Sequence, residues 1–212
     1  MNIDNEAFRR DAEAGYGEYV KAGKLPDIPP QFVYGDGRGG ERVMLIGEAP
    51  GKDEVKQGRP FVGAAGKILN ELLSRTGIAR ETLYITNTVK YRLARAGKKA
   101  GTLANRPVKK FEIALCRDWL RREIEELSPA LIITLGGTAL SGALGCADDG
   151  GGSLRDVTVG QAHGRTETIT VNGLAYTLIP LYHPASLIYN PELRTAYYSD
   201  LEEVRRCVQS IL

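Results

Sequence analysis

The feature that most constrains the fold is a long loop rich in glycine and proline over residues 47–66. It follows a short apolar run, Val43 to Ile46, and leads into an amphipathic stretch, Ala65 to Arg75, whose apolar residues recur at helical spacing. A plain strand-to-helix connection needs only about two to six residues. The loop therefore has a shape to hold, and strand, loop and helix together predict a pocket at the carboxyl end of a strand.

Strands and helices alternate along the rest of the chain. Further strands are expected at 83–86, 130–135 and 176–181, and helices at 5–22, 108–127, from 137 onward and after Asn190-Pro191. Alternation at 157–159 and 166–171, with Asn172-Gly173 as the turn, predicts a hairpin whose second arm runs into the last strand. The predicted fold class is α/β: a three-layer α/β/α arrangement with a central four-stranded, mostly parallel sheet. We expect residues 1–212 to form one domain, with 1–40 as a helical and Pro/Gly-rich lead-in.

Composition sets outer limits on function. The chain is 42% hydrophobic and 25% charged, which is ordinary for a soluble globular protein. No apolar run approaches the ~18 residues of a membrane span, and the polar N-terminus does not resemble a signal peptide. Cys116, Cys146 and Cys207 contain no CxxC pair, so neither a disulfide framework nor a metal site is indicated. We expect a cytoplasmic monomer with no membrane partner.

One segment is strongly basic. Between Thr82 and Phe111 there is no acidic residue, while Lys and Arg together number eight. Clustered positive charge favours a nucleic-acid backbone through counterion release. The candidate backbone contacts are Lys90, Arg92, Lys98, Lys99, Lys109 and Lys110. A solvated surface loop is the alternative.

Three loops are expected to meet at one edge of the sheet, because the carboxyl ends of parallel strands lie together. They carry residues 48–61, Asn87 and residues 183–187. The side-chain amide of Asn87 has one acceptor and two donors, so it can pair with two neighbouring polar groups of a ligand. A strand-end turn residue is the alternative reading of Asn87.

Four motifs occur in order along residues 41–205: Gly47-Glu48-Ala49-Pro50-Gly51 with Gly58-Arg59-Pro60-Phe61-Val62-Gly63, Ile85-Thr86-Asn87-Thr88-Val89-Lys90, Leu135-Gly136-Gly137-Thr138-Ala139-Leu140, and His183-Pro184-Ala185-Ser186-Leu187. In order and spacing they resemble family 4 uracil-DNA glycosylases. The resemblance implies a monofunctional enzyme of base excision repair that flips uracil out of DNA and hydrolyses its N-glycosidic bond, leaving an abasic site.

The resemblance also implies roles for individual residues. The Asn87 amide would pair with uracil N3–H and O4 together, whereas cytosine presents the opposite pattern and would leave polar groups unpaired, at about 1–3 kcal/mol each. Phe61 would stack on the base, although core packing is its ordinary alternative. His183 would bond the uracil O2 as negative charge develops on the leaving base, with a structural histidine as the alternative. Leu187 takes the position of the apolar wedge that fills the gap left by the everted nucleotide. His163 is expected to be a surface or structural residue.

The remaining candidates surround these residues. Glu48 is assigned to shaping the loop and orienting water, and Glu54 to excluding the thymine methyl group, while Asp53 could equally be a cap. Ala49 stands where the best-known uracil-DNA glycosylases carry an aspartate, so the resemblance implies a dissociative route. The other predicted substrate-binding residues are Gly47, Pro50, Gly51 and Ser186.

Three departures from the family are visible. Family 4 enzymes carry four cysteine ligands for a [4Fe–4S] cluster, whereas here Tyr91 takes the third position and only Cys116 remains, so no cofactor is expected. The basic loop is longer than usual and has no histidine, which predicts ordinary turnover without a covalent DNA adduct. Tyr189 stands where the family commonly has arginine.

Two other functions stay open. The substrate could be another deaminated base, hypoxanthine or xanthine, or the chain could be a non-catalytic DNA-binding module on the same fold. A Rossmann-type cofactor enzyme is disfavoured, because Gly47-x-x-x-Gly51 lacks the GxGxxG spacing.

Overall fold

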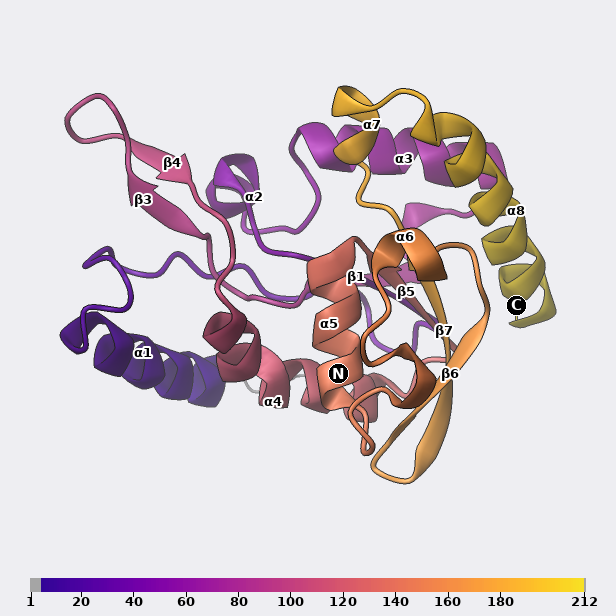
Figure 1. Cartoon of the computed structure of the whole chain (residues 1–212), viewed down its shortest axis with the longest axis horizontal. Coiled ribbons are helices and arrows are strands. Elements are labelled where there is room, and N and C mark those ends of the chain that lie inside the picture. The colour runs from indigo at the N-terminus through magenta and orange to yellow at the C-terminus, as the bar shows by residue number, and fades with distance from the viewer. Residues whose placement is uncertain (1–4, 212) are drawn as a thin grey trace.

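A mostly parallel five-stranded sheet forms the middle layer of the protein (Figure 1). The computed structural model describes residues 5–211, with side chains from residue 10 onward. The strand order is β2-β1-β5-β7-β6, and only β6 is antiparallel to its neighbour. The bounds are β1 Val43–Gly47, β2 Leu83–Asn87, β5 Leu131–Leu135, β6 Glu167–Val171 and β7 Leu174–Leu181.

Helices cover both faces of this sheet, and the predicted three-layer fold is confirmed. Along β1, Val43 and Leu45 face one side and Met44 and Ile46 the other, as the two-residue period of a strand requires. The first side packs against α3 (Ala64–Thr76) and α8 (Leu193–Ile211), and the second against α4 (Lys110–Leu127) and α5 (Gly137–Cys146). The remaining helices are α1 Asn5–Lys21, α2 Lys52–Gln57, α6 Val159–Ala162 and α7 Ser186–Tyr189. Among the helices of residues 5–211, none is sufficiently long and apolar to cross a bilayer.

The expected sheet of four strands was one strand short. The predicted hairpin around Asn172-Gly173 exists, and its first arm, β6, pairs with β7 and adds an edge strand to the main sheet. Asn172 and Gly173 both have positive φ (50° and 75°), as a tight two-residue hairpin turn requires. The predicted arm at 157–159 was wrong, because Thr158 caps α6 instead.

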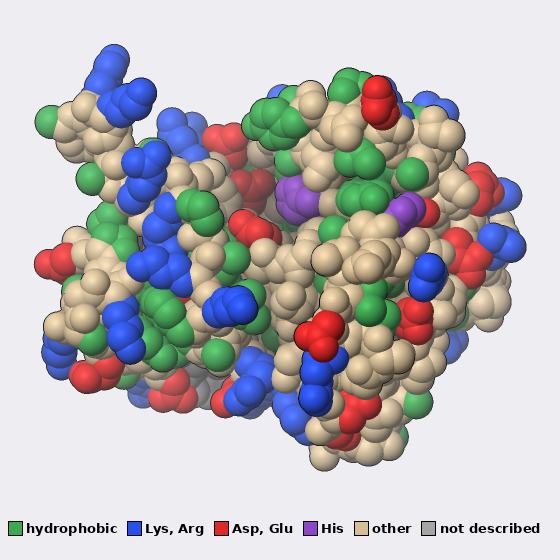
Figure 2. Space-filling view, viewed as in Figure 1, with side chains coloured by type: hydrophobic (Ala, Val, Ile, Leu, Met, Phe, Trp, Pro, Cys, Tyr) green, Lys and Arg blue, Asp and Glu red, His purple; other side chains and the backbone are tan. Residues whose placement is uncertain are grey.

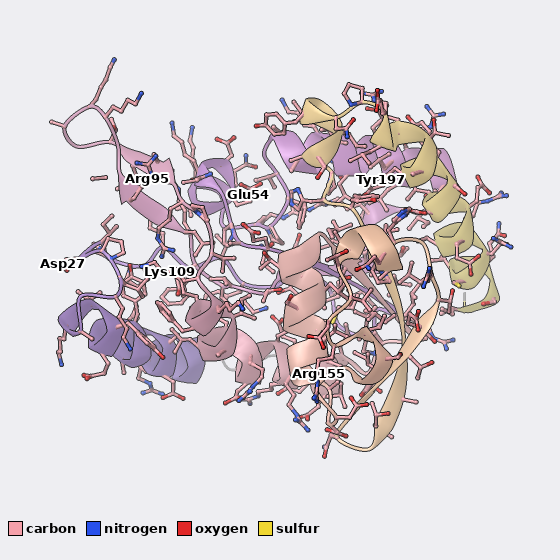
Figure 3. The ribbon with its side chains drawn as sticks, viewed as in Figure 1. Asp27, Glu54, Arg95, Lys109, Arg155 and Tyr197 are labelled. Atoms are coloured by element: carbon pink, nitrogen blue, oxygen red, sulfur yellow. The ribbon has the colours of Figure 1, made fainter. Side chains whose placement is uncertain are left out.

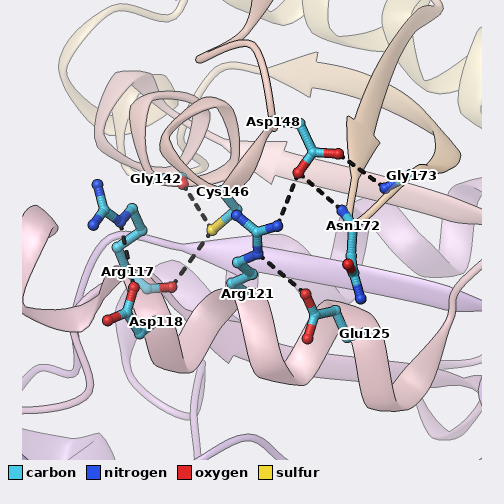
Figure 4. Close-up of polar contacts among 9 residues, drawn as sticks. All are labelled: Arg117, Asp118, Arg121, Glu125, Gly142, Cys146, Asp148, Asn172 and Gly173. Atoms are coloured by element: carbon cyan, nitrogen blue, oxygen red, sulfur yellow. Dashed lines mark hydrogen bonds and ion pairs between the residues drawn. The ribbon is translucent and has the colours of Figure 1, made fainter.

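Asp148 holds the hairpin turn against the rest of the protein (Figure 4). Its carboxylate accepts hydrogen bonds from the backbone N–H groups of Asn172 (3.0 Å) and Gly173 (2.9 Å). Arg121 of α4 donates to the same carboxylate at 2.8 Å. These bonds lower the pKa of Asp148, the two backbone donors most strongly.

The basic segment folds into a small separate hairpin, β3 (Ala94–Ala96) and β4 (Leu103–Asn105), which projects at the upper left of Figure 1. At its foot Arg106 donates to both oxygens of the buried Glu112, at 2.7 and 2.8 Å. The Tyr91 hydroxyl donates to Glu112 as well, at 2.8 Å. Burial alone would raise the pKa of Glu112, but these bonds and one from the Lys109 N–H lower it.

This arrangement generates a prediction about stability. Arg106→Ala should lower the free energy of unfolding by about 3–5 kcal/mol, because it leaves the Glu112 carboxylate buried without its cation. Arg95→Ala, at an exposed site on β3, is the matched control and should change it by less than about 0.5 kcal/mol. Urea unfolding followed by circular dichroism measures both, and equal losses would contradict the assigned role of Arg106. Because the pKa of Glu112 is lowered in the fold, its contribution should be lost as pH falls through that pKa.

Candidate functional site

The predicted loops meet at the carboxyl ends of the parallel strands. Gly47 ends β1 directly opposite Asn87 at the end of β2. On the other side of β1, Leu135 at the end of β5 pairs with Leu181 at the end of β7. The Gly136 N–H donates to the Leu181 carbonyl at 2.8 Å. His183 follows β7, so all three segments reach the same edge.

Gly47 lies between the two side chains expected to hold a base. A Cβ atom at this position would fall 2.5 Å from Asn87 Oδ1 and 2.5 Å from the nearest ring carbons of Phe61. Such distances do not occur for real Cβ atoms, so only glycine allows the amide and the aromatic ring to approach the strand end together.

The loop that carries Phe61 is held in a specific shape. Phe61 has φ = 53°, an uncommon backbone conformation for a bulky residue. Its carbonyl oxygen lies 1.9 Å from where a Cβ of Gly66 would be, so the first turn of α3 also needs glycine. Glu54 accepts hydrogen bonds from the N–H groups of Gly51, Val62 and Gly63, at 3.1, 3.0 and 2.7 Å.

These bonds give Glu54 a role in holding the loop that was not expected from the sequence. Its carboxylate ties both ends of the loop together and is occupied by backbone donors, although the residue still lines the cavity. Asp53 lies in the first turn of α2, where a carboxylate suits the helix dipole. The N-cap of α2 is Gly51.

His183 is half-buried beside Phe61, with ring centroids 6.0 Å apart. Burial lowers the pKa of His183, and the nearby charge of Glu48 partly opposes this effect. The ring Nδ1 lies 3.2 Å from the Ala185 N–H and accepts its hydrogen bond. The neutral imidazole therefore carries its proton on Nε2, as a hydrogen-bond donor.

Glu48 is fixed by its neighbours. Thr138, at the start of α5, donates its hydroxyl to Glu48 Oε2 at 2.6 Å. The Glu48 carbonyl accepts from the Val89 N–H at 2.9 Å. The side chain is therefore placed to influence His183 through its charge.

A cavity of about 300 Å³ opens in front of these side chains. In Figure 2 histidine and acidic side chains gather in a hollow between the Lys/Arg-rich lobe of the β3–β4 hairpin and the lobe that carries α7 and α8. The volume is within the range of small-ligand pockets. The lining residues are Ala49, Gly51, Lys52, Asp53, Glu54, Phe61, Gly63, Ala64, Ala65, Asn87, Asn105 and His183.

Seven predicted residues line this cavity: Ala49, Gly51, Asp53, Glu54, Phe61, Asn87 and His183. Gly47 and Pro50 are buried behind it, and Ser186 lies beyond it at the start of α7. Asn105 was missed, because it is brought in by the β3–β4 hairpin, whose fold no local motif announced. Its Oδ1 accepts from Arg92 Nε at 3.1 Å, which orients the amide.

Lys90 was wrongly predicted to contact the DNA backbone. Its side chain is 1% exposed and forms an ion pair with Glu123 at 2.5 Å. It also donates to Thr86 Oγ1 at 2.7 Å and to the Asn87 carbonyl at 2.5 Å. Lys90 therefore holds the end of β2, and the apolar residues on either side of it, Val89 and Tyr91, were the available signal of burial.

Leu187, expected to take the position of the wedge, does not face solvent. It is 4% exposed and packs into the core cluster with α3 and α8. The short helix α7 turns Leu187 inward and exposes the next two side chains, Ile188 and Tyr189.

The predicted basic residues other than Lys90 lie on or near the hairpin. Lys98, Lys99, Lys109 and Lys110 are exposed, and Arg92 is half-exposed and bonded to β4. Figure 3 shows Arg95 on β3 with Lys109 at the foot of the hairpin, while Glu54 lies on the side of α2 that faces the hollow. The positive charge therefore flanks the cavity.

Sequence comparison agrees with this geometry. Residues 34–204 match the family model of the uracil DNA glycosylase superfamily, and the chain belongs to that superfamily.

Within it, the chain is similar to proteins named type-4 uracil-DNA glycosylase. It is 35% identical over 173 residues to that of Archaeoglobus fulgidus, covering 82% of this chain and 80% of the relative. For Saccharolobus solfataricus the values are 35% over 188 residues, with 88% and 81% covered. For Thermotoga maritima they are 36% over 180 residues, with 84% and 83% covered.

The iron–sulfur cluster of the family does not fit the residues present here. Such a cluster needs four thiolates, and the chain has three cysteines in all. Cys116 is buried, and burial raises the pKa of its thiol to about 11, which disfavours a thiolate ligand. Tyr91 packs edge-on against Tyr16, with ring centroids 5.3 Å apart. Among residues 5–211 no group of three or more His, Cys, Asp or Glu side chains is placed to hold a metal.

The environment of His183 yields a measurable titration. Its pKa should lie below the ordinary 6.5, because burial disfavours the charged ring. Glu48→Gln should lower that pKa further, because it removes the carboxylate that favours the cation. NMR titration of the histidine ring signals measures the pKa of His183 in the wild type and in Glu48→Gln, and the His183→Gln variant assigns the resonance. A rise in the pKa of His183 on Glu48→Gln would contradict the assigned geometry.

Proposed function

We propose that this protein is a monofunctional uracil-DNA glycosylase. The observation that supports it best is the approach of Phe61, Asn87 and His183 to one base-sized cavity at the sheet edge. The similar proteins carry the name type-4 uracil-DNA glycosylase, which points in the same direction.

The cavity has the parts needed to recognise an everted base. A base in duplex DNA must leave the stack before an enzyme can reach its glycosidic bond. The ring of Phe61 offers a stacking face, and the Asn87 amide offers an acceptor for uracil N3–H and a donor for O4. Lys90 fixes the carbonyl of Asn87, so the amide is attached to a rigid strand end.

His183 would supply the electrostatic part of catalysis. The Nε2–H of the neutral ring can donate a hydrogen bond to uracil O2, where negative charge develops as the glycosidic bond breaks. The bond between the sugar carbon and the uracil nitrogen breaks, and both electrons leave on the uracil as an anion. A water oxygen then bonds to the sugar carbon, and the proton that this water loses neutralises the uracil anion through solvent. Ala49 offers no side-chain base, so the cationic sugar forms before water attacks.

One experiment tests this proposal against its alternatives. Matched oligonucleotides containing uracil, hypoxanthine, xanthine or thymine are incubated with the protein, and abasic sites are revealed by alkali. We expect release of uracil alone. Preferential release of hypoxanthine or xanthine would show that the enzyme acts on one of those bases instead. Release of no base would favour a non-catalytic DNA-binding module. A parallel set without alkali should show no strand cleavage, although Lys52 lies on the cavity wall.

Variants of the assigned residues sharpen that experiment. Asn87→Ala and His183→Ala should each lower uracil release by about 10²-fold or more, because each removes a group aimed at the leaving base. Asn70→Ala on the exposed face of α3 and His163→Gln, whose ring bonds Asp200 at 2.8 Å, are the matched controls and should stay active. If Asn87→Ala and His183→Ala both released uracil at the wild-type rate, the roles assigned to these two residues would be wrong.

Charge on the hairpin should determine DNA affinity. Replacing Lys98 and Lys99 by alanine should reduce the slope of log affinity against log salt by about 0.9 for each phosphate that the variant no longer neutralises. A double Arg205, Arg206 variant on α8 removes equal charge at the opposite side of the protein (Figure 1). Fluorescence anisotropy measures the dependence of DNA affinity on salt. If both variants had the same slope of log affinity against log salt, the hairpin would be an ordinary solvated surface and not a DNA contact.

A further inference from the structure

A second cavity, of about 120 Å³, lies at the edge strand β2 and shares no lining residue with the cavity that contains His183. It has room for one small oxyanion in place of water. Three arginine side chains from separate segments of the chain line it: Arg38, Arg59 and Arg80. Guanidinium groups repel one another unless an anion lies between them. Their convergence therefore indicates a negatively charged ligand.

The walls of this cavity are fixed by the sheet. Leu83 and Ile85 of β2, which are 2% and 1% exposed, form its apolar part. Asp36 pairs with Ile85 through two backbone hydrogen bonds, of 2.8 and 2.9 Å. Arg38 follows two residues later, and its backbone N–H donates to the Glu41 carboxylate. The backbone of the site is consequently held in place before any ligand arrives, which lowers the cost of binding.

Arg80 is half-buried without a hydrogen bond to a carboxylate. Within residues 5–211 its guanidinium donates to two neutral oxygens, Asn70 Oδ1 at 3.0 Å and the Pro60 carbonyl at 2.8 Å. Burial lowers the pKa of Arg80, and the charge of Asp36 only partly opposes this effect. A bound anion would supply the counter-charge that these two neutral acceptors lack.

The other two arginines also keep free donors. Arg59 directs both Nε and Nη2 at a single oxygen, Asp36 Oδ2, at 3.0 and 2.8 Å. Arg38 is exposed, and among the described residues its side chain has no hydrogen bond or ion pair. Each guanidinium has five N–H donors, so several point to no partner. The second acid of the lining, Glu81, is exposed, and three positive charges against two negative ones leave the site positive.

We propose that Arg38, Arg59 and Arg80 form a phosphate-binding site at the edge of β2, separate from the base cavity. Guanidinium forks match phosphate oxygens in a bidentate manner, and a tetrahedral phosphate presents oxygens in more directions than a flat carboxylate does. Because Arg80 also bonds the Pro60 carbonyl, the ligand would steady the loop that carries Phe61. The phosphate belongs either to the backbone of bound DNA or to a free ion.

Thermal unfolding of the whole chain tests the site with inorganic phosphate, against sodium chloride at the same ionic strength. Saturating phosphate should raise the Tm of the wild type by about 2–4 °C, because a ligand of the native state stabilises it by mass action. Acetate should raise the Tm less. Arg38→Ala should weaken phosphate binding by about tenfold without changing the Tm in chloride, because it removes a charged donor that has no partner in the fold. Arg165→Ala, at an exposed position before β6 on the opposite edge of the sheet, is the matched control.

A second variant should act in the opposite direction. Asp36→Asn removes a negative charge from the cavity and releases donors of Arg59, so it should tighten phosphate binding by about threefold or more. A merely structural role of the Asp36 carboxylate would give no such gain. Weaker phosphate binding by Asp36→Asn would contradict the assigned site.

Binding of uracil-free duplex DNA distinguishes the two sources of phosphate. If a DNA phosphate occupies the site, Arg38→Ala should reduce the slope of log affinity against log salt by about 0.9 relative to the wild type and to Arg165→Ala. An unchanged slope, together with the loss of the phosphate effect on Tm, would assign the site to a free ion. If Arg38→Ala matched the wild type in both measurements, the proposal would be wrong. Neither measurement involves uracil, so this failure would leave the proposed function untouched.

Discussion

The absence of a side chain at Gly47 is the constraint on which the site depends. Any Cβ atom there would overlap both Asn87 Oδ1 and the Phe61 ring. The close approach of an amide and an aromatic ring therefore requires the strand to end in glycine. The same holds at Gly66, which leaves room for the Phe61 carbonyl, and at Gly136, where φ is 91° and a Cβ would lie 3.1 Å from His183 Cβ.

Behind this edge lies a buried polar network that keeps the strand end in place. Glu123 accepts from Lys90, from the Thr86 hydroxyl and from the Tyr84 hydroxyl, the last at 3.0 Å. Breaking such a buried pair by removing one partner typically costs about 3–5 kcal/mol. Because Lys90 also bonds the Asn87 carbonyl, the network links the core to the residue that carries the cavity amide. A charge that sequence reading assigned to DNA is thus part of the scaffold.

Much of the fold could be predicted, because hydrophobic period and turn chemistry are local. The apolar runs indicated the parallel strands, and Asn172-Gly173 indicated the hairpin between β6 and β7. The segment at 157–159 failed because its alternation is only three residues long, and the cap at Thr158 decided its structure. The approach of the strand-end loops followed from sheet geometry, but side-chain direction did not. Leu187 and Ile188 are neighbours of similar polarity, and only the turn of α7 determines which one is buried.

The central claim is that an everted uracil occupies the cavity between Phe61, Asn87 and His183. The most direct test is a crystal structure of the protein with duplex DNA carrying 2′-fluoro-deoxyuridine. The account predicts the base stacked on Phe61, its N3–H and O4 paired with Asn87, and its O2 facing His183 Nε2. A base bound outside this cavity, or one that leaves the Asn87 amide unpaired, would contradict it.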